Sequence, residues 1–563
     1  MHPAAHPTPP LLRLALPGAL LLCLGCPPME SDPFASPPSP ADVIEPGDGG
    51  GIVGVGPEAP PCEQAAVGMR RLAEDAQARG VNAVLDDPAD AQTLTRFDHG
   101  GRIVISDLDD DGDDDLLFGM SLSGPMLYAN DGGSFTLQPL GPSRLELPAS
   151  VPEWVSLAAV DLDDDGLPEI VAGGPWEVVS WPNQGDLRFG SPRTLHRIDP
   201  GPKVLISMTS FGDADGDGDL DAYITTDGIQ LDAQGQGLPP GVPDALLLGR
   251  GDGTFDPPIE MKVGNMGGSS LVSGFIDVDG DGAMEIMAAA SGASVPPTAV
   301  WQRDPSDGTW SDIAASIGMD WRFAAMGFDG ADLNGDQVPD LCFTDVGAPR
   351  CLLTDAQDGP YEGGAALGLA QGDAAEQVGW SFEIADLDND GREDVLQASG
   401  PAMSMDPSNG DTSMPDLLWV GRDDGRFVDA TDESGFGSDG NHLGVATADL
   451  DGDGWLEIVL AGPGERPLLY GNRCGSGHWL EVEFEGPSGN VQGFGTRATV
   501  VAGERSWTRT LHASRGPAQG PARLHFGLGD AAAVDAVVVA WPNGLRTVVR
   551  DVPISRRVTI AAP

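Results

Sequence analysis

The sequence predicts an all-β protein: a seven-bladed β-propeller followed by a small C-terminal β domain. A nine-residue acidic loop occurs seven times, and the first residues of consecutive copies lie 52 to 64 residues apart. The apolar runs on either side of the loops are three to six residues long and end at turn residues, which is typical of strands. A repeat of about this length with several strands per unit indicates propeller blades.

The acidic loop has the composition of a cation site. Its clearest copies run from Asp107 to Asp115, from Asp161 to Glu169 and from Asp449 to Glu457. Carboxylates stand at positions one, three, five and nine, and glycine at position six. Calcium prefers six to eight oxygen ligands, and glycine allows a sharp turn around it. Without a cation, each pair of unit charges about 4 Å apart costs roughly 1 kcal/mol in water and roughly 4 near a protein surface.

The predicted ligands occupy positions one, three, five, seven and nine, with position seven binding through its backbone carbonyl. We expect about seven calcium ions. The ligands are Asp107, Asp109, Asp111, Asp113, Asp115, Asp161, Asp163, Asp165, Leu167, Glu169, Asp213, Asp215, Asp217, Asp219, Asp221, Asp277, Asp279, Asp281, Ala283, Glu285, Asp332, Asn334, Asp336, Val338, Asp340, Asp386, Asp388, Asp390, Arg392, Asp394, Asp449, Asp451, Asp453, Trp455 and Glu457.

Two other calcium motifs are excluded by position and by spacing. An EF-hand needs a bidentate glutamate at position twelve, where the first two loops have Phe118 and Ala172. A nonapeptide β-roll would repeat its loop about every nine residues. The fifth loop differs from the others, because Asn334 replaces a carboxylate and Gln337 replaces glycine. We therefore predict that it is the weakest of the seven sites.

A second feature recurs in several units, namely a polar turn that ends on an aromatic residue. It appears at Asn130–Phe135, Gly249–Phe255, Asp304–Trp310 and Gly421–Phe427. Each unit is then a strand, an acidic loop, a strand, a hairpin turn and a strand. This pattern resembles the FG-GAP (integrin α-type, VCBS) repeat, and the propeller is predicted over residues 98–475. The resemblance implies that the ions lie on one face of the propeller and leave the other face for a partner.

The N-terminus has the features of an export signal. Residues 1–26 hold Arg13, an apolar run from Leu14 to Leu24 that is too short to span a bilayer, and then Cys26. The end of this run resembles a bacterial lipobox, which implies lipid on Cys26 and a lipoprotein of the outer membrane or cell surface. The alternative is an ordinary cleaved signal and a periplasmic or secreted protein.

Two segments are predicted between this signal and the propeller. Residues 27–61 are rich in proline and glycine and predict a solvated tether. Residues 62–97 predict a short helical lead-in, because Ala65, Met69, Leu72 and Ala76 follow helical spacing.

Four cysteines remain for disulfides in an oxidising compartment. Cys342 and Cys351 flank the hairpin after the fifth loop, which predicts a cross-strand disulfide. Cys62 would then pair with Cys474 and close the ring of blades.

The pattern changes at residues 476–563, where a C-terminal β domain is predicted. His478–Glu485 alternates apolar and acidic residues, as a half-buried strand does. Further apolar runs lie at Arg497–Val501, Val534–Ala540 and Val558–Ile560. Gly493–Arg497, His525–Gly529 and Trp541–Gly544 resemble the motifs of the ASPIC/UnbV domain. A propeller of FG-GAP repeats followed by this domain resembles the cartilage acidic protein-like family.

Charge and missing motifs restrict the function. The net charge of -57 disfavours nucleic acid and anionic lipid as direct partners. Seven calcium ions would add 14 positive charges and leave about -43. No HExxH or GxSxG motif is present. The sequence therefore favours a non-catalytic binding or adhesion protein for an extracellular glycan or protein. The alternatives are a polysaccharide lyase or hydrolase with its site in the propeller channel, and a scaffold for another exported protein.

Overall fold

The computed structural model describes most of the chain beyond the N-terminal segment. The described residues are 47–59, 72–85, 102–119, 125–138, 156–174, 176–198, 205–227, 242–263, 270–278, 280–290, 297–354, 361–370, 377–400, 414–438, 440–471 and 475–563. Cys26, Cys62, Asp279 and Cys474 lie outside these ranges, so lipidation and the Cys62–Cys474 pairing remain predictions. In the described part of the chain, no helix is long and apolar enough to cross a membrane.

Seven sheets in the described residues correspond to the seven predicted units; the strands of each unit pair antiparallel, and its acidic loop lies between the first two. The first three sheets contain β3 (Arg102–Ser106), β4 (Asp115–Gly119), β5 (Met126–Asp131) and β6 (Ser134–Leu137); β7 (Ser156–Val160), β8 (Glu169–Gly173), β9 (Glu177–Trp181) and β10 (Arg193–Arg197); and β11 (Leu205–Gly212), β12 (Asp221–Asp227), β13 (Asp244–Leu247) and β14 (Ile259–Met261). The next three contain β15 (Ser270–Ile276), β16 (Glu285–Ala290), β17 (Ala299–Arg303) and β18 (Trp310–Asp312); β19 (Phe328–Ala331), β20 (Asp340–Asp345), β21 (Gly347–Leu353) and β22 (Tyr361–Glu362); and β23 (Gly379–Ala385), β24 (Asp394–Ser399), β25 (Leu417–Gly421) and β26 (Phe427–Asp429).

The seventh sheet closes the ring with a strand from the start of the described chain. It contains β27 (Gly444–Ala448), β28 (Glu457–Ala461), β29 (Leu468–Gly471) and β2 (Ala73–Glu74). β2 pairs antiparallel with β29. The predicted helical lead-in is therefore wrong at Ala73 and Glu74, because hydrogen bonding to the open edge of β29 outweighs the helical spacing.

The core of the propeller lies between neighbouring blades. Leu116, Leu117 and Phe118 of β4 are all fully buried, because each sheet is covered on both faces. Apolar side chains of the seventh and first blades form one cluster, which includes Val459 and Ile103. A Cβ on Gly274 of β15 would come within 2.2 Å of the Phe328 ring, so glycine allows the fourth and fifth blades to pack closely.

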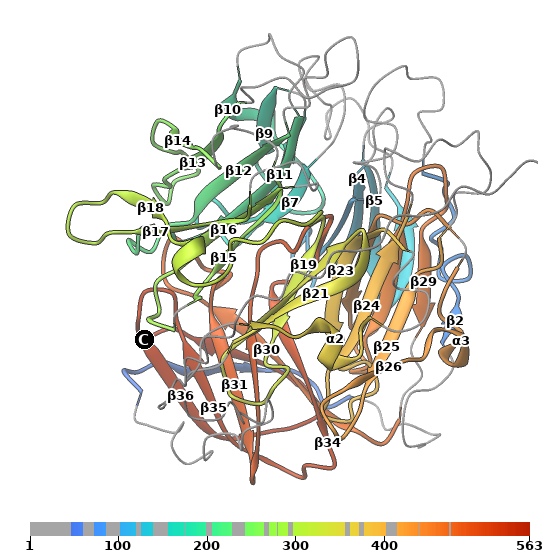
Figure 1. The fold of residues 1–563 in the computed structure, drawn as a ribbon. Coiled ribbons are helices and arrows are strands. Elements are labelled where there is room, and N and C mark those ends of the chain that lie inside the picture. The colour runs from blue at the N-terminus through green and yellow to red at the C-terminus, as the bar shows by residue number, and fades with distance from the viewer. Residues whose placement is uncertain are drawn as a thin grey trace, which may run out of the picture.

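The remaining sheets form the predicted C-terminal domain. One sheet orders β1 (Gly51–Val55), β37 (Arg557–Ala561), β30 (His478–Glu485) and β34 (Arg523–Gly529). The other orders β32 (Arg505–Thr510), β31 (Arg497–Ala502), β35 (Val534–Ala540) and β36 (Arg546–Val552). These strands lie together on one side of the ring of blades (Figure 1).

β1 corrects the predicted tether. Gly51–Val55 falls inside the segment expected to be a solvated linker, yet it pairs antiparallel with β37. The pairing depends on backbone hydrogen bonds, and Ile52 packs against the core of the C-terminal domain. Val53 and Val55 are apolar although their side chains are exposed. The segment therefore lacks the alternation of apolar and polar residues that would have marked a strand in the sequence.

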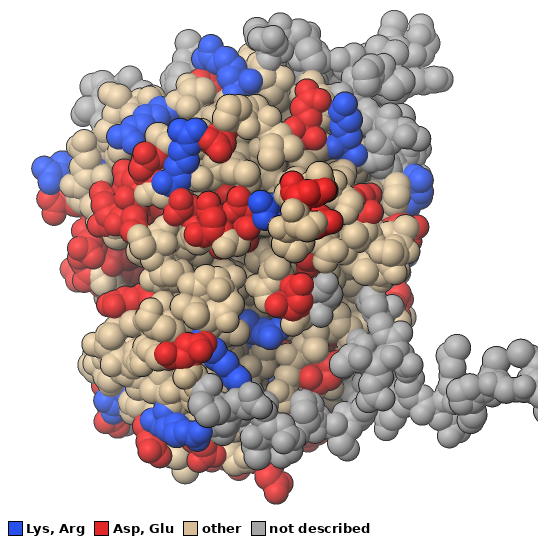
Figure 2. All heavy atoms as spheres, turned by 90° about the vertical axis from the view of Figure 1, so that its left-hand side faces the viewer, with Lys and Arg blue, Asp and Glu red and all other residues tan. Residues whose placement is uncertain are grey.

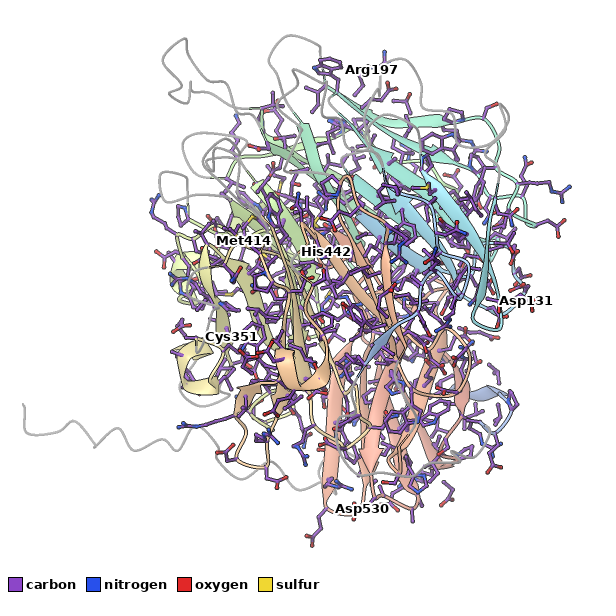
Figure 3. The ribbon with its side chains drawn as sticks, turned by 90° about the vertical axis from the view of Figure 1, so that its right-hand side faces the viewer. Asp131, Arg197, Cys351, Met414, His442 and Asp530 are labelled. Atoms are coloured by element: carbon purple, nitrogen blue, oxygen red, sulfur yellow. A yellow bond between two sulfur atoms is a disulfide. The ribbon has the colours of Figure 1, made fainter. Side chains whose placement is uncertain are left out.

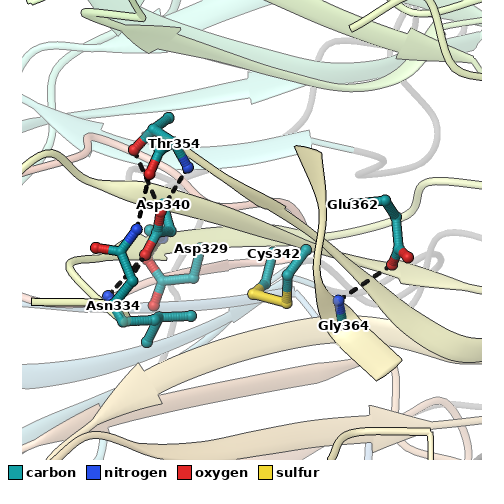
Figure 4. Close-up of a disulfide and its surroundings, with 10 residues drawn as sticks. Asp329, Asn334, Asp340, Cys342, Thr354, Glu362 and Gly364 are labelled. Atoms are coloured by element: carbon teal, nitrogen blue, oxygen red, sulfur yellow. Dashed lines mark hydrogen bonds between the residues drawn. A yellow bond between two sulfur atoms is a disulfide. The ribbon is translucent and has the colours of Figure 1, made fainter. Parts of the chain in front are cut away.

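The described helices are single turns: η1 (Ala314–Ser316), α2 (Gly364–Leu367) and α3 (Thr431–Ser434). Cys342 and Cys351 face each other across β20 and β21 and form a disulfide, as the sequence predicted. Figure 4 shows this disulfide beside the fifth acidic loop. The fold class predicted from the sequence is confirmed.

Candidate metal centres

Each acidic loop is organised around its first aspartate, which accepts hydrogen bonds from the loop backbone. Asp107 Oδ1 accepts from the N–H groups of Asp110 and Asp111 at 2.8 and 3.2 Å, and its Oδ2 accepts from Gly112 at 2.9 Å. Asp161 accepts from the same three positions of the second loop. This side chain therefore fixes the turn before any cation binds.

Two positions in every loop have left-handed backbone conformations. Position six has a positive φ in all seven loops, which explains the glycine expected there. Gln337 of the fifth loop adopts the same conformation, with a φ of 69°. Position four also has a positive φ, between 53° and 80°, which the sequence analysis missed. Its residues are Asp110, Asp164, Gly216, Gly280, Gly335, Asn389 and Gly452. The signal was present, because only glycine, aspartate and asparagine occupy this position, and they tolerate this conformation best.

The acid at position nine ties the loop to the third strand of its blade. Asp115 Oδ2 accepts from the Leu108 N–H at 3.0 Å, and its Oδ1 accepts from the Asn130 N–H at 2.9 Å. The Asn130 amide in turn donates to the carbonyl of Leu450 in the seventh loop at 2.9 Å. The first blade and the seventh loop are therefore linked directly.

The structure brings three acidic groups within 4.8 Å of one another in five of the seven loops, among the residues it describes. The groups are Asp107, Asp109 and Asp115; Asp161, Asp163 and Glu169; Asp213, Asp215 and Asp221; Asp386, Asp388 and Asp394; and Asp449, Asp451 and Asp453. In four loops the cluster joins positions one, three and nine. The position-five carboxylate, as in Asp111, instead accepts from the position-seven N–H at 3.0 Å.

The donor set fits a hard divalent cation. The Oδ1 atoms of Asp109 and Asp163 are buried and have no hydrogen-bond partner among the described residues. Burial, with the nearby charge of Asp111, raises the pKa of Asp109 to about 6. Burial and the charge of Asp109 raise the pKa of Asp115 to about 8. A cation here would satisfy the free oxygens and cancel the repulsion, and carboxylates at these positions would hold it.

Two loops depart from this arrangement. In the fifth loop, Asn334 donates to the Thr354 carbonyl at 2.7 Å instead of adding a negative charge (Figure 4). In the seventh loop, Arg79 contacts Glu457 at 3.2 Å, which partly neutralises the acid at position nine.

The face that carries the loops is the face on which the C-terminal domain sits. Arg523 forms buried ion pairs with Asp114 of the first loop and with Glu481, and its Nε lies 3.2 Å from the Glu481 carboxylate. Arg509 pairs with Glu393 of the sixth loop. Asp114 and Glu393 both stand at position eight, and no other loop has an acid there. That difference was the sequence signal for these contacts, and it was missed.

The segment between β32 and β34 enters the centre of the ring. Its two-residue strand β33 (Ala518–Gln519) pairs parallel with β3 of the first blade. The Gln519 amide makes two hydrogen bonds to the backbone of Ala159 in the second blade, at 2.9 and 2.8 Å. Arg515 reaches Asp329 and Glu383 of the fifth and sixth blades, each at 3.1 Å. The segment thus contacts inner strands on several sides of the channel.

One buried histidine–carboxylate pair has the residue types of a catalytic site but not the geometry. His442 Nδ1 lies 2.7 Å from Asp416, and Ser438 Oγ lies 3.3 Å from the same nitrogen. A serine nucleophile would need the opposite nitrogen, Nε2, which instead faces Glu465 at 3.4 Å. Burial lowers the pKa of His442, but Asp416 and Glu465 outweigh burial and raise it to about 10. The group is best described as a fixed ion pair.

Comparisons with known proteins agree with this architecture. Residues 107–172, 161–224 and 386–460 match the model of the FG-GAP-like repeat, and residues 486–563 match that of ASPIC and UnbV. No curated protein matches the chain. Similar solved structures include an Agrocybe aegerita lectin specific for non-reducing terminal N-acetylglucosamine (18% identity, 59% of this chain and 79% of the lectin, TM-score 0.37). Others are Saccharomyces cerevisiae Sqt1 (11% identity, 67% of this chain and 97% of Sqt1, TM-score 0.39) and the Dos1 propeller (10% identity, 63% of this chain and 74% of that chain, TM-score 0.36).

The structural similarities are too weak to bear on function, whereas the family matches cover five of the seven acidic loops and most of the C-terminal domain. The chain therefore carries FG-GAP-like repeats in a β-propeller, followed by an ASPIC and UnbV domain.

Proposed function

We propose that the protein is an exported binding protein, stabilised by about seven calcium ions, that recognises an extracellular glycan or protein without converting it chemically. The observation that carries this proposal is the position of the C-terminal domain. It covers the loop-bearing face, and its 511–523 segment lies against the inner strands. The metal centres then serve to hold blades and domain together.

The alternative of a channel enzyme is less favoured by the same observation. A polysaccharide-cleaving site in the channel would need open space and catalytic groups there. Arg515 and Gln519 instead bond to inner-strand groups from the loop side of the channel. The described histidine–carboxylate pair at His442 is fully buried. These points support binding over catalysis.

The N-terminal sequence is the basis on which we propose a surface location. We propose that Cys26 carries a lipid and that the chain after it holds the propeller away from the membrane. The side of the propeller opposite the C-terminal domain would then remain available for a partner. Arg197 of the second blade and Asp530 of the C-terminal domain mark these two ends of the molecule (Figure 3).

Size-exclusion chromatography tests the proposal with the whole mature chain. The protein is mixed in millimolar calcium with a panel of extracellular polysaccharides, and both components are followed. Co-elution of protein with intact polymer is the expected result for a glycan-binding protein. Progressive shortening of a polymer would establish the enzyme instead. No change with any polymer would refute glycan binding and leave a protein ligand, to be sought by cross-linking on cells.

A further inference from the structure

The inner strands of the blades all start at the end of the channel opposite the C-terminal domain, which we call the distal end. β3 begins at Arg102, β23 at Gly379 and β27 at Gly444, and each of these strands runs from there toward its acidic loop. The C-terminal domain contacts the loops, at the other end of the same strands. A polar group buried at the distal end must therefore be satisfied by the propeller, by water or by a ligand.

Arg102 is a buried arginine without an acidic partner. Its side chain is only 6% exposed, and its guanidinium donates to the carbonyl of Ser207 in the third blade at 3.0 Å. Its Nε is buried and has no hydrogen-bond partner among the described residues, and no carboxylate in the described part of the chain pairs with it. Burial lowers the pKa of Arg102 to about 10, so the side chain is still charged at neutral pH.

A shortage of acids does not explain this unpaired charge. The chain has 87 acidic residues and 30 basic ones, and acidic side chains gather in a band across the face shown in Figure 2. Two buried acids of the distal end have other partners: Asp244 accepts from Ser270 Oγ at 2.7 Å, and Asp416 lies 2.7 Å from His442 Nδ1. Buried charges in proteins are normally paired, because an unpaired one destabilises the fold strongly. A partner from outside the chain accounts for Arg102.

Two further side chains of the distal end also lack partners. Gln377 lies just before β23 in the sixth blade, and Asn441 lies just before β27 in the seventh. Gln377 Oε1 and Asn441 Oδ1 are buried and accept no hydrogen bond from a described residue. Together with Arg102 of the first blade, these groups belong to three consecutive blades of the ring. Such orphaned groups are rare in native proteins, so their occurrence in consecutive blades indicates a ligand site.

The surrounding structure holds these groups in place. The inner strands of the sixth and seventh blades start from a buried apolar cluster, which includes Met326, Val378, Trp380 and Leu443. The Trp380 indole donates to the Gly400 carbonyl at 3.3 Å, and the Asn441 N–H donates to Glu465 at 2.9 Å. A ligand would therefore meet side chains on a fixed frame, which reduces the entropy lost on binding.

We propose that the distal end is the ligand site of the binding function above, on which the inference rests, and that Arg102 binds a single carboxylate of an acidic glycan there. A guanidinium binds a carboxylate through two parallel hydrogen bonds. One arginine balances one negative charge, and the net charge of -57 repels ligands that carry many. The amide oxygens of Gln377 and Asn441 accept hydrogen bonds from hydroxyl groups, which a sugar offers in addition to its carboxylate.

Isothermal titration calorimetry of the whole mature chain in millimolar calcium tests the proposal with two matched probes. The first is xylotriose carrying one methylglucuronate, and the second is its carboxyl-reduced form, which differs only in the charged group. We expect the acidic probe to bind at least about tenfold more tightly. Arg102→Met should abolish this preference, whereas Arg102→Lys keeps the charge and should lose less affinity. Arg303→Met is the control, because Arg303 also donates to a carbonyl of another blade, that of Asp215 at 3.2 Å, but on the loop side.

Thermal melting separates ligand binding from a structural role of Arg102. Arg102→Met removes an unpaired buried charge, so its melting temperature should equal or exceed that of the parent protein. A marked fall in its melting temperature would assign Arg102 to the fold and overturn the proposal. Unchanged binding by Arg102→Met, or equal loss in Arg303→Met, would also overturn it.

The remaining outcomes concern the class of ligand. Equal affinity for the two probes would show that no carboxylate is recognised, and tighter binding of a blocked tetrapeptide with one aspartate would replace the glycan by a peptide. Binding of neither oligosaccharide would overturn the inference. Co-elution with a polymer of the polysaccharide panel would then leave the broader function intact, and its absence would show that glycan binding fails as well.

Discussion

The first and sixth acidic loops share one motif but lie in different surroundings. Both have an acid at position eight that pairs with an arginine of the C-terminal domain. In the first loop, Asp110, Asp111 and Gly112 are exposed. In the sixth loop, Asp386 and Asn389 are buried beneath the C-terminal domain, at 3% and 0% exposure.

The cover over the sixth loop is specific. Gly529 donates its N–H to the Asn389 carbonyl at 3.0 Å, and His525 Nε2 lies 2.8 Å from the Asn389 side chain. A Cβ on Gly527 would come 1.8 Å from Asp386 Oδ2, so only glycine fits against this carboxylate. The comparison teaches that the loop sequence specifies the acidic cluster, while the docked domain decides how far that cluster is sealed from water.

Calcium removal should have the largest effect. Chelation leaves each cluster with uncompensated negative charge and is expected to lower the melting temperature by on the order of 10 °C or more. The sixth loop should release its ion last, because the C-terminal domain covers it. Scanning calorimetry with and without chelator measures the shift, and native mass spectrometry over time follows ion loss. An unchanged melting temperature would mean that the loops do not hold calcium.

Removing the arginine beside the first loop should have the next largest effect. Arg523→Met leaves Asp114 buried without its partner, since the two side chains are only 6% and 2% exposed. We expect a loss of about 3–5 kcal/mol in the free energy of unfolding. Arg509→Met is the matched variant at the sixth loop, where the pair is 11% and 14% exposed, and it should cost about half as much. Equal losses in urea denaturation would contradict the role of burial in this difference.

Equivalent substitutions at position one compare the cation sites directly. Asp386→Asn weakens a sealed site and is expected to cost about 2–3 kcal/mol in calcium, whereas Asp107→Asn in the exposed loop should cost about 1 kcal/mol. Both variants keep the side-chain volume and one acceptor oxygen. Denaturation in calcium and in chelator gives the two differences. The difference between the losses of the two variants should shrink in chelator. A difference that persists there would show that it arises from packing and not from cation binding.

The sequence predicted most of the fold because the repeat is encoded locally. Residues such as Asp107, Asp115 and Gly112 have types that the loop geometry demands, so seven copies were visible without any knowledge of tertiary contacts. The disulfide between Cys342 and Cys351 could be predicted for the same reason, since both cysteines flank one hairpin.

The contacts between the domains could not be predicted in this way. β1 and β2 pair through backbone groups at sheet edges, which any side chains can do. The two residues of β33 are too few to make a pattern, although they place the segment inside the ring. The acids at position eight were visible, but their partner arginines lie 116 and 409 residues away in sequence. Long-range pairing of this kind has no local signature.

A pH dependence in the absence of calcium should be the smallest effect. Burial raises the pKa of Asp115 to about 8 and that of Asp221 to about 8, above the value near 4 of an unfolded aspartate. The folded state then keeps protons that the unfolded state has lost, so the stabilisation is complete below about pH 4 and is lost as the pH rises through 8. In chelator, the free energy of unfolding should fall from pH 5 to pH 8.

The domain contacts should not obscure this trend. Burial alone would raise the pKa of Glu481, but the guanidiniums of Arg523 and Arg557 lower it to about 2, so these pairs stay ionised throughout the range. In millimolar calcium, the ion takes the place of the protons and the fall should largely disappear. Urea denaturation at pH 5, 6.5 and 8, with calcium and with chelator, measures both series. Parallel slopes in the two series would show that the carboxylates of the acidic loops do not exchange protons for the cation.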